Sequence, residues 1–262
     1  MLEQLDFYGL SDQGRHRDTN EDCYIAQSIG RREAVLLAAI DGVGGYEGGE
    51  VAAGIAQETV IALLSGSAQA ETVLTEPVLA EPVQQINEAI TEANNRIYEK
   101  ARTDAILSAM GCVLTVAIAD PVARRVYYGH VGDTRLYLWS EGELRKLSRD
   151  HSIVGLFEDL GQLTEEEAMQ HPKRNEILRL LGRDLQQPND ENFINTGTAD
   201  FVPGDMLLLC SDGLTDLVTK KEISLVLSHE LSVKAKAQAL VDAANQAGGH
   251  DNITVVLAHF RQ

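Results

Sequence analysis

The chain has 262 residues, of which 44% are hydrophobic and 24% are charged, so it is long enough to bury a large core. Its formal net charge of −18 at pH 7 adds repulsion toward nucleic acids and anionic membranes, and we expect neither as a partner. No Pro-, Gly- or Ser-rich linker divides the chain, which favours one domain over residues 1–262, and we expect a monomer.

The three cysteines, Cys23, Cys112 and Cys210, each lie in or beside an apolar run, and none belongs to a C-x-x-C pair. This pattern is typical of buried, reduced thiols rather than of a disulfide framework or a zinc site. The N-terminus lacks a basic start followed by an apolar segment, and no run approaches the length of a membrane span. We therefore expect a cytoplasmic protein.

The first half of the chain is predicted to form strands followed by two helices. Strands are expected over residues 5–11, 23–28 and 34–40, and helices from residue 50 and over residues 83–102, with a loop at 65–82 between them. Further strands are expected over residues 112–119, 124–131, 134–140 and 143–147. Their short connections predict an antiparallel meander.

The second half is predicted to be more mixed. Residues 150–182 form a polar and helical insert, with a capping box at Thr164-x-x-Glu167 and a short helix over 175–181 that ends at Gly182. Strands follow over residues 194–199 and 206–210, then a short helix opened by the capping box Thr219-x-x-Glu222, a longer helix over 233–244 and a last strand over 253–258. Strand groups interleaved with helix pairs indicate an α+β fold with antiparallel sheets covered by helices.

Aspartates next to predicted strands recur along the chain: Asp22, Asp41, Asp133, Asp212 and Asp251. A single Asp-Gly pair is an ordinary turn signal. If the strand ends converge, however, several carboxylates repel one another, and such a cluster is stable only when cations neutralise it. Hard oxygen ligands favour Mg²⁺ or Mn²⁺, so the recurrence predicts a shared metal site.

Five ordered segments carry a family resemblance: GRHRDTNED, DGVGG with GGE after it, HVGDTRLY, SDGL and GGHDNITVV. They resemble the metal-dependent protein phosphatases of type 2C in their compact bacterial form, over nearly the whole chain. The resemblance implies a four-layer αββα sandwich, in which two antiparallel sheets pack face to face and are flanked by helices, with a metal cleft at one end. It also implies hydrolysis of phosphoserine and phosphothreonine in proteins.

The resemblance assigns metal ligands residue by residue. Asp41 bridges two metal ions, the backbone carbonyl of Gly42 holds one of them, and Asp212 and Asp251 hold the other. Asp22 supports this pair through water or by contact with a ligand. Asp133, together with Asp212, resembles the ligands of a third ion. Two cations that share a water lower its pKa, so that hydroxide attacks phosphorus directly.

Arg17 matches the arginine that binds the substrate phosphate in the family, since its planar guanidinium suits two oxygens at once. The alternative for Arg17 is a surface ion pair with Asp18 or Glu21. Asn252 is expected to shape the loop that presents Asp251.

The sequence departs from the family pattern at the expected proton donor. Val43 stands where animal members have His and bacterial members usually have Met, and Tyr46 stands where many bacterial members have His. His171 in the insert is a candidate donor, beside a purely structural role. We hypothesise that the protein cleaves aryl phosphates more readily than alkyl phosphates, because a phenolate leaves with less help. At Gly111-Cys112-Val113, two threonines of the family are replaced, which predicts weaker support for the metal.

The insert at residues 150–182 resembles the flap that borders the cleft in bacterial relatives. At its middle, His171, Lys173 and Arg174 either contact a phosphopeptide or form a solvated helix start. Two other functions remain open. A phosphoprotein-binding pseudophosphatase with weak or no turnover fits the missing His and threonines. A metal-dependent nucleotide or nucleic-acid hydrolase is disfavoured, because the chain lacks a G-x-x-x-x-G-K-[ST] loop and a basic patch.

Overall fold

The computed structural model describes residues 5–30, 33–44, 48–65, 81–188, 190 and 192–261. Within these residues the strands form two five-stranded antiparallel sheets. One sheet has the order β1 (Leu5–Asp12), β10 (Ile253–Phe260), β9 (Met206–Cys210), β6 (Arg135–Ser140) and β7 (Glu143–Lys146). The other has the order β2 (Cys23–Ile29), β3 (Ala34–Val43), β4 (Gly111–Asp120), β5 (Arg125–Val131) and β8 (Asn195–Asp200).

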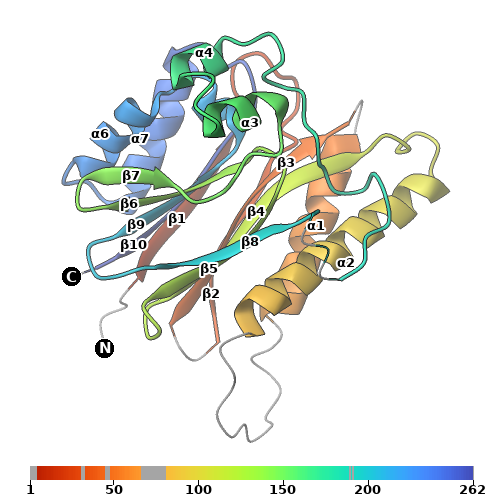
Figure 1. Cartoon of the computed structure of the whole chain (residues 1–262), viewed down its shortest axis with the longest axis horizontal. Coiled ribbons are helices and arrows are strands. Elements are labelled where there is room, and N and C mark those ends of the chain that lie inside the picture. Colours follow the sequence, from red (N-terminus) through yellow and green to blue (C-terminus); the bar gives the residue numbers. More distant parts are fainter. Residues whose placement is uncertain are drawn as a thin grey trace, which may run out of the picture.

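Helices cover the outer face of each sheet (Figure 1). The sheet that contains β2, β3, β4, β5 and β8 packs against α1 (Gly48–Ser65) and α2 (Glu81–Thr103). The sheet that contains β1, β10, β9, β6 and β7 packs against α5 (Asp212–Thr215), α6 (Lys220–Ser228) and α7 (Val233–Gln246). Two short helices, α3 (Ile153–Asp159) and α4 (Glu165–Met169), lie at one end of the sandwich. The predicted four-layer αββα fold is confirmed.

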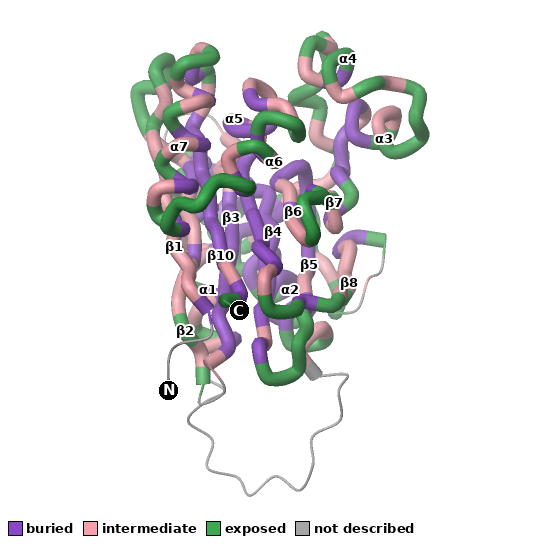
Figure 2. Tube along the Cα trace, turned by 90° about the vertical axis from the view of Figure 1, so that its left-hand side faces the viewer, coloured by how far each residue is buried: buried purple, intermediate pink, exposed green. Residues whose placement is uncertain are grey.

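Strand β3 shows why these residues form layers. Its residues Leu36, Ala38 and Ile40 pack under the helices, whereas Val35, Leu37 and Ala39 face the opposite sheet. Figure 2 shows β3 as a mostly buried strand, and its residues 34–40 are all buried. Because successive side chains of a strand point to opposite faces, a continuous apolar run is what a strand buried on both sides requires. Asp41 continues the row that faces the other sheet, so its carboxylate lies at the end of the space between the sheets.

The structure corrects two predictions about strands. Strand β3 extends beyond residue 40 to Val43, so Asp41 lies inside the strand and pairs with Val113 rather than following its end. The predicted meander is wrong, because β5 and β6 belong to different sheets. The short connection crosses the sandwich at Gly132, whose φ of 108° favours glycine and where an added Cβ would lie 2.1 Å from a Val113 methyl.

The predicted helix over residues 175–181 is also wrong. This segment is a turn followed by extended chain, in which Leu178 N–H donates to the His151 carbonyl and Leu181 exchanges two backbone hydrogen bonds with Cys112. Hydrogen bonds to distant backbone therefore replace those that a helix would have made. Both predicted capping boxes are present, at Thr164 and at Thr219.

The remaining elements differ mainly at their ends. Helix α1 begins at Gly48 and α2 at Glu81, each two residues before its predicted start, and most of the predicted loop at 65–82 lies outside the described residues. The helices α3 and α5 were not predicted individually. No helix in the described part of the chain combines the length and the apolar character needed to cross a membrane.

Candidate active site

The five aspartates singled out in the sequence lie where strands begin or end. Asp22 directly precedes β2, Asp41 is near the end of β3, Asp133 follows β5 by two residues, Asp212 follows β9 by two residues, and Asp251 precedes β10 by two residues. Because neighbouring strands in an antiparallel sheet run in opposite directions, the start of one strand and the end of the next lie at the same end of the sandwich. This is the end of the sandwich that carries α3 and α4 (Figure 1).

Mutual repulsion identifies these carboxylates as one cluster. Burial raises the pKa of Asp41 well above its ordinary value, and the charges of Asp22, Asp212, Asp133 and Asp251 raise it further. Burial likewise raises the pKa of Asp212 well above its ordinary value, and the charges of Asp133, Asp216, Asp251 and Asp22 add to this rise. A group of carboxylates with this environment keeps its full charge only when something positive compensates it.

The two most buried members of the cluster have different surroundings. Burial raises the pKa of Asp22 to about 6, although the Ser211 hydroxyl donates to its Oδ2 at 2.8 Å and opposes the rise. Burial raises the pKa of Asp133 to about 7, and the charges of Asp150 and Asp216 contribute to that rise. The Asp22 side chain is therefore held by a hydrogen bond, whereas Asp133 is surrounded by like charges.

Two carboxylate oxygens of the cluster have no hydrogen-bond partner although they are buried: Asp22 Oδ1 and Asp212 Oδ1. Unpaired buried oxygens are costly, and hard oxygen donors are the ligands that divalent cations such as Mg²⁺ prefer. The donor set therefore fits a hard cation. Among the described residues, no three His, Cys, Asp or Glu side chains converge closely enough to complete a metal-ligand group as they stand.

Arg17 lies at the rim of this cluster. Its guanidinium donates to Asp251 Oδ2 at 2.7 Å, so its ion pair is with Asp251 and with neither Asp18 nor Glu21. The hydrogen bond to Asp251 raises the pKa of Arg17, and the charges of Glu21 and Asp41 contribute. The arginine that the sequence selects for phosphate binding is thus within electrostatic range of the carboxylate selected as the metal bridge.

Asn252 ties the segment of Arg17 to the end of the chain. Its Nδ2 donates to the carbonyls of Gln13 and Thr19, and its Oδ1 accepts from Glu21 N–H, all at 2.9 Å. Its own N–H donates to Asp251 Oδ1 at 2.8 Å. One side chain therefore fixes residues 13–21 against the loop that carries Asp251.

Gly42 allows three parts of the chain to approach one another. A Cβ at this position would lie 2.3 Å from the Gly49 carbonyl oxygen and 2.6 Å from the Glu21 carbonyl oxygen. The Gly42 N–H donates to the Glu21 carbonyl at 3.2 Å. Any side chain here would push apart β3, the start of α1 and the segment that precedes Asp22.

Comparisons with known proteins agree with this architecture. Residues 13–255 match the family described as Protein phosphatase 2C. The chain is 35% identical over 249 residues to the serine/threonine phosphatase stp of Listeria welshimeri, and the alignment covers 94% of this chain and 92% of that protein. It is 33% identical over 257 residues to the protein phosphatase PhpP of Streptococcus pneumoniae, and this alignment covers 97% of this chain and 96% of that protein. The chain belongs to the protein phosphatase 2C family.

Solved structures of phosphatases are similar over the same extent. The serine/threonine phosphatase of S. agalactiae has a TM-score of 0.82 and 32% identity, covering 98% of this chain and 100% of that one. The catalytic domain of the phosphatase PstP, solved in complex with two manganese ions, has a TM-score of 0.80 and 30% identity, covering 98% and 99%. The protein is a protein serine/threonine phosphatase of the 2C type, and phosphoproteins are its substrate class.

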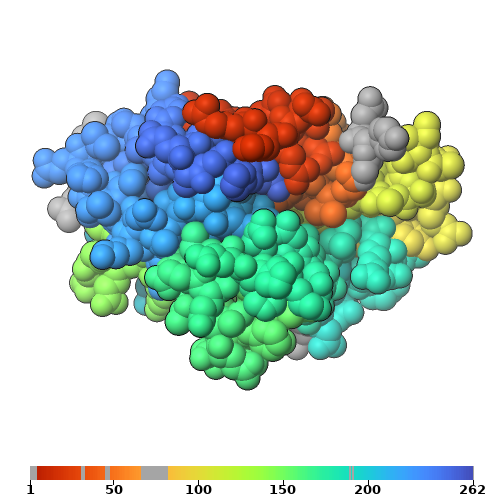
Figure 3. Space-filling model, turned by 90° about the horizontal axis from the view of Figure 1, so that it is seen from above, coloured from red at the N-terminus to blue at the C-terminus, as the bar shows by residue number. Residues whose placement is uncertain are grey.

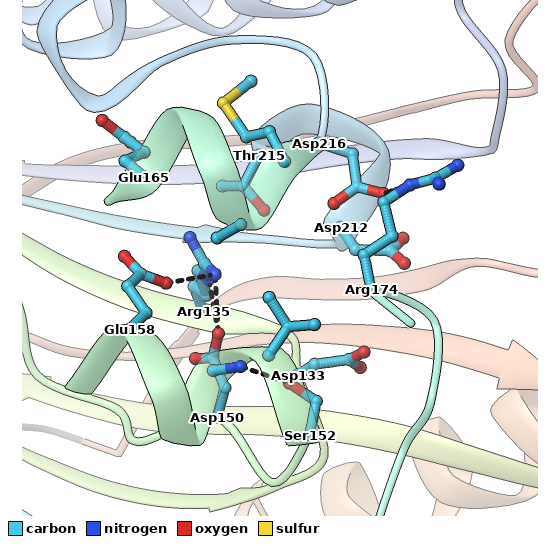
Figure 4. A pocket seen from close by; sticks show the side chains of 14 residues that line it. Asp133, Arg135, Asp150, Ser152, Glu158, Glu165, Arg174, Asp212, Thr215 and Asp216 are labelled. Atoms are coloured by element: carbon cyan, nitrogen blue, oxygen red, sulfur yellow. Dashed lines mark hydrogen bonds and ion pairs between the residues drawn. The ribbon is translucent and has the colours of Figure 1, made fainter. Parts of the chain in front are cut away.

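In this phosphatase, the three residues singled out in the insert have separate positions. His171 Nδ1 accepts from the Lys173 N–H at 3.1 Å, and Lys173 forms an exposed ion pair with Glu176 at 3.3 Å. Arg174 Nε instead donates to Asp216 Oδ2 at 3.0 Å. Figure 4 shows Arg174 beside Asp216 and Asp212, with Asp133 nearby. Of the three, Arg174 is the one that joins the insert to the carboxylate cluster.

Seen from above, the insert lies beside the segments from both ends of the phosphatase chain (Figure 3). Between the insert and the sheets is a small pocket of about 30 Å³ lined by residues that include Asp133, Asp212, Asp216 and Arg174. The insert therefore covers one side of the carboxylate cluster.

Sequence reasoning missed two members of the cluster. Asp216 follows Asp212 by four residues, the spacing that brings two side chains to one face of a helix, and this was the available signal. Ser211 donates to Asp22 across a sequence separation of 189 residues, which no local pattern indicates.

Two of the positions that depart from the family pattern, Cys112 and Val113, lie on β4 beside Asp41, and Val43 pairs with Gly111 at the end of β3. Val113 is the cross-strand partner of Asp41, and it is fully buried. Cys112 is the partner of Gly42, and burial together with the charge of Asp41 raises the pKa of its thiol. Tyr46 lies outside the described residues.

Proposed function

We propose that this phosphatase binds two divalent cations, Mg²⁺ or Mn²⁺, in the carboxylate cluster. Asp41, the Gly42 carbonyl, Asp212 and Asp251 would hold them, and Asp22 would support Asp212 and Asp251. A third ion would use Asp133 and Asp212. The observation that carries the proposal is the shared rise of the pKa values of these buried carboxylates, whose charges repel one another. When bound, the ions supply an activated water for attack on phosphorus and compensate the carboxylate charge.

The residues of the chain itself position the substrate and the ligands. Arg17 would move from Asp251 to two oxygens of the substrate phosphate, because its planar fork matches that geometry. Asn252 keeps the segment of Arg17 fixed to the loop of Asp251 while this happens. Ser211 holds Asp22 by its Oδ2 and leaves Oδ1 available for a water or a ligand.

The insert at residues 150–182 would act as a flap at the mouth of the site. Arg174 holds it to Asp216, one helical turn from Asp212. His171 and Lys173 would face the substrate protein, because neither is engaged with the carboxylate cluster in its hydrogen bonds. Free, buried thiols such as Cys112 and Cys210 suit a reducing compartment, and we infer that the protein acts in the cytoplasm. We also propose that it is a monomer.

The deciding experiment measures phosphate release from a phosphothreonine peptide with Mn²⁺, with Mg²⁺ and with EDTA. We expect turnover with metal, loss of turnover with EDTA, and loss of turnover in Asp41→Ala under all conditions. Mn²⁺ binding without turnover in the wild type would instead support the phosphoprotein-binding pseudophosphatase. A nucleotide panel serves as the control, and release of phosphate from it would indicate a different hydrolase.

We further propose that, with Val43 and Tyr46 at the two positions where relatives have His, no proton donor assists the departing alkoxide. Aryl phosphates then react faster than alkyl phosphates, because a phenolate departs with less help. The measurement compares kcat/KM for p-nitrophenyl phosphate and for the phosphothreonine peptide at one Mn²⁺ concentration. Replacement of Tyr46 by His should raise the rate on the peptide and leave the aryl rate unchanged. Comparable turnover of the two substrates by the wild type would contradict this proposal.

A further inference from the structure

A groove of about 1150 Å³ lies on the side of the sandwich where one edge of each sheet is found. Its walls are the end of β7 with the segment that follows it (residues 145–152), the end of α3, residues 178–179, and strand β8. Figure 2 shows β7, β8 and α3 along this same side of the molecule. Because β8 is an edge strand, it has one side without a strand partner in the sheet.

Three arginines in this groove have no carboxylate partner among the described residues: Arg145, Arg149 and Arg179. The two acidic residues that line the groove, Asp150 and Asp159, are both already paired with Lys146, at 3.5 and 3.2 Å. The groove therefore carries uncompensated positive charge in a chain whose net charge is −18. A positive groove on an acidic protein attracts an acidic ligand against the overall repulsion.

The surroundings of Arg179 leave its donors available. Its guanidinium lies 3.3 Å from His151 Nε2, while His151 Nδ1 accepts a hydrogen bond from Gly132 N–H at 3.2 Å. A neutral imidazole that accepts at Nδ1 carries its hydrogen at Nε2, so two N–H groups face each other there. Arg179 thus has no acceptor in this contact, and an anionic group in the groove would supply one.

The groove is also lined by apolar side chains. Leu156, Leu160 and Leu178 line it, and each is about half exposed to solvent. A ligand that matches this lining carries apolar side chains among acidic ones. The length of an edge strand and the open side of β8 suit an extended chain rather than a helix.

We propose that this groove docks an extended, acidic stretch of the phosphoprotein substrate, away from the phosphorylated residue itself. This proposal rests on the proposed function. Asp150 and Ser152 line both the groove and the pocket of Asp133 and Asp212, so a chain in the groove ends at the wall of the active site. Docking there would select phosphoproteins by a sequence outside the phosphorylation site.

The first test measures binding apart from catalysis. A fluorescent, unphosphorylated peptide of about 15 residues, with Glu, Asp and Leu side chains, is titrated and followed by anisotropy. The exposed pair is changed in the double variant Arg145→Gln/Arg149→Gln, and the control is Lys221→Gln/Lys234→Gln, which removes the same charge from exposed positions on α6 and α7. We expect Kd to rise about tenfold in the first variant and to stay unchanged in the control.

Three binding results would overturn the proposal. They are equal weakening in both double variants, equal affinity for a peptide with Gln and Asn in place of Glu and Asp, and equally tight binding of single-stranded DNA. The last result would identify a nonspecific anion-binding surface.

The second test measures kinetics with the phosphothreonine form of the acidic peptide and with p-nitrophenyl phosphate. In Arg145→Gln/Arg149→Gln we expect a roughly tenfold higher KM for the peptide, with kcat and the p-nitrophenyl phosphate rates unchanged. Peptide binding without any metal-dependent turnover would refute the proposed function and leave the docking proposal standing. Turnover of phosphopeptides without binding of the acidic peptide would refute the docking proposal alone.

Discussion

Two groups of buried polar side chains meet at the peptide of Gly132 and Asp133, and they are built in opposite ways. On one side, Asp133 belongs to the carboxylate cluster, in which Asp22 Oδ1 and Asp212 Oδ1 lack partners. On the other side, Thr115, His130 and Thr134 form a network in which every buried side-chain nitrogen and oxygen has a hydrogen-bond partner, and His151 joins it by accepting from Gly132 N–H.

The histidine network is neutral because of its contacts. The Gly132 carbonyl accepts from His130 Nε2 at 2.9 Å, so Nε2 carries the hydrogen, and the Thr115 hydroxyl bonds to Nδ1 at 2.8 Å. Burial lowers the pKa of His130 to about 4, and burial, together with the neighbouring His130 and the charge of Arg179, lowers that of His151 to about 3. A buried group that is fully paired and uncharged stabilises the fold, whereas one with repelling charges and free oxygens is suited to bind an ion.

The largest effect should follow from neutralising the carboxylate cluster. We expect Asp212→Asn to lower kcat/KM for a phosphothreonine peptide by roughly a thousandfold, because a cation ligand and its charge are lost. In EDTA, the same variant should unfold at an equal or higher temperature than the wild type, since a repelling buried charge is gone. A variant that is inactive and also less stable in EDTA would show that Asp212 has a structural role like that of the histidines.

The pH dependence of stability should separate the two groups by sign. Folded Asp133 keeps its proton up to about pH 7, whereas the unfolded carboxyl loses it near 3.8. The folded state binds more protons in this window, so the contribution of Asp133 to stability is lost as pH rises through 7. Without metal, the wild type should lose between about 1 and 4 kcal/mol relative to Asp133→Asn from pH 4 to pH 8.

The histidines should act in the opposite direction. Folded His130 stays neutral down to about pH 4, whereas the unfolded ring protonates near 6.5, so its contribution is lost as pH falls from 6.5 toward 4. Urea titrations in EDTA at each pH unit test both signs. The same slope for Asp133→Asn and for the wild type would contradict the assignment of the first effect to Asp133.

Removing one hydroxyl from the histidine network should cost stability and spare catalysis. Thr115→Val keeps the shape of the side chain but leaves His130 Nδ1 and the Thr134 hydroxyl without their shared partner. We expect a loss of about 1–3 kcal/mol, the usual cost of an unpaired buried polar group. The kcat of the folded enzyme should change by less than about threefold. A loss of metal-dependent activity with unchanged melting temperature would show that the network belongs to the active site.

The sequence predicted the carboxylate cluster far better than the histidine network, and the reason is physical. Asp41, Asp212 and Asp251 each follow or precede an apolar run in the sequence, and repetition of one local pattern is visible without the fold. The network joins Thr115 on β4, His130 on β5 and Thr134 on the crossing between sheets, and its members share no local pattern. The sequence predicts that this connection continues the antiparallel meander, because a short connection alone does not show that the next strand joins the other sheet. The helix expected over 175–181 failed for a related reason, since its backbone bonds to His151 and Cys112.

The smallest expected effect lies at the contact between the two groups. Val113 is the cross-strand neighbour of Asp41, and one of its methyl groups packs against Gly132. Val113→Thr would place a hydroxyl next to the carboxylate proposed to bridge two ions, at nearly the same volume. A hydrogen bond that orients a ligand strengthens metal binding, and we expect the Mn²⁺ concentration for half-maximal activity to fall about two- to fivefold.

The paired substitution decides whether that gain comes from the hydroxyl or from altered packing. Val113→Ala removes the methyl groups without adding a donor, so it should lower stability and leave the Mn²⁺ dependence unchanged. If Val113→Thr and Val113→Ala shift the Mn²⁺ dependence alike, then packing under Gly132 controls the position of Asp41, and the two groups of buried polar side chains are mechanically coupled. If only Val113→Thr shifts it, then the carboxylate cluster is tuned by its own hydrogen bonds and the histidine network acts as its support.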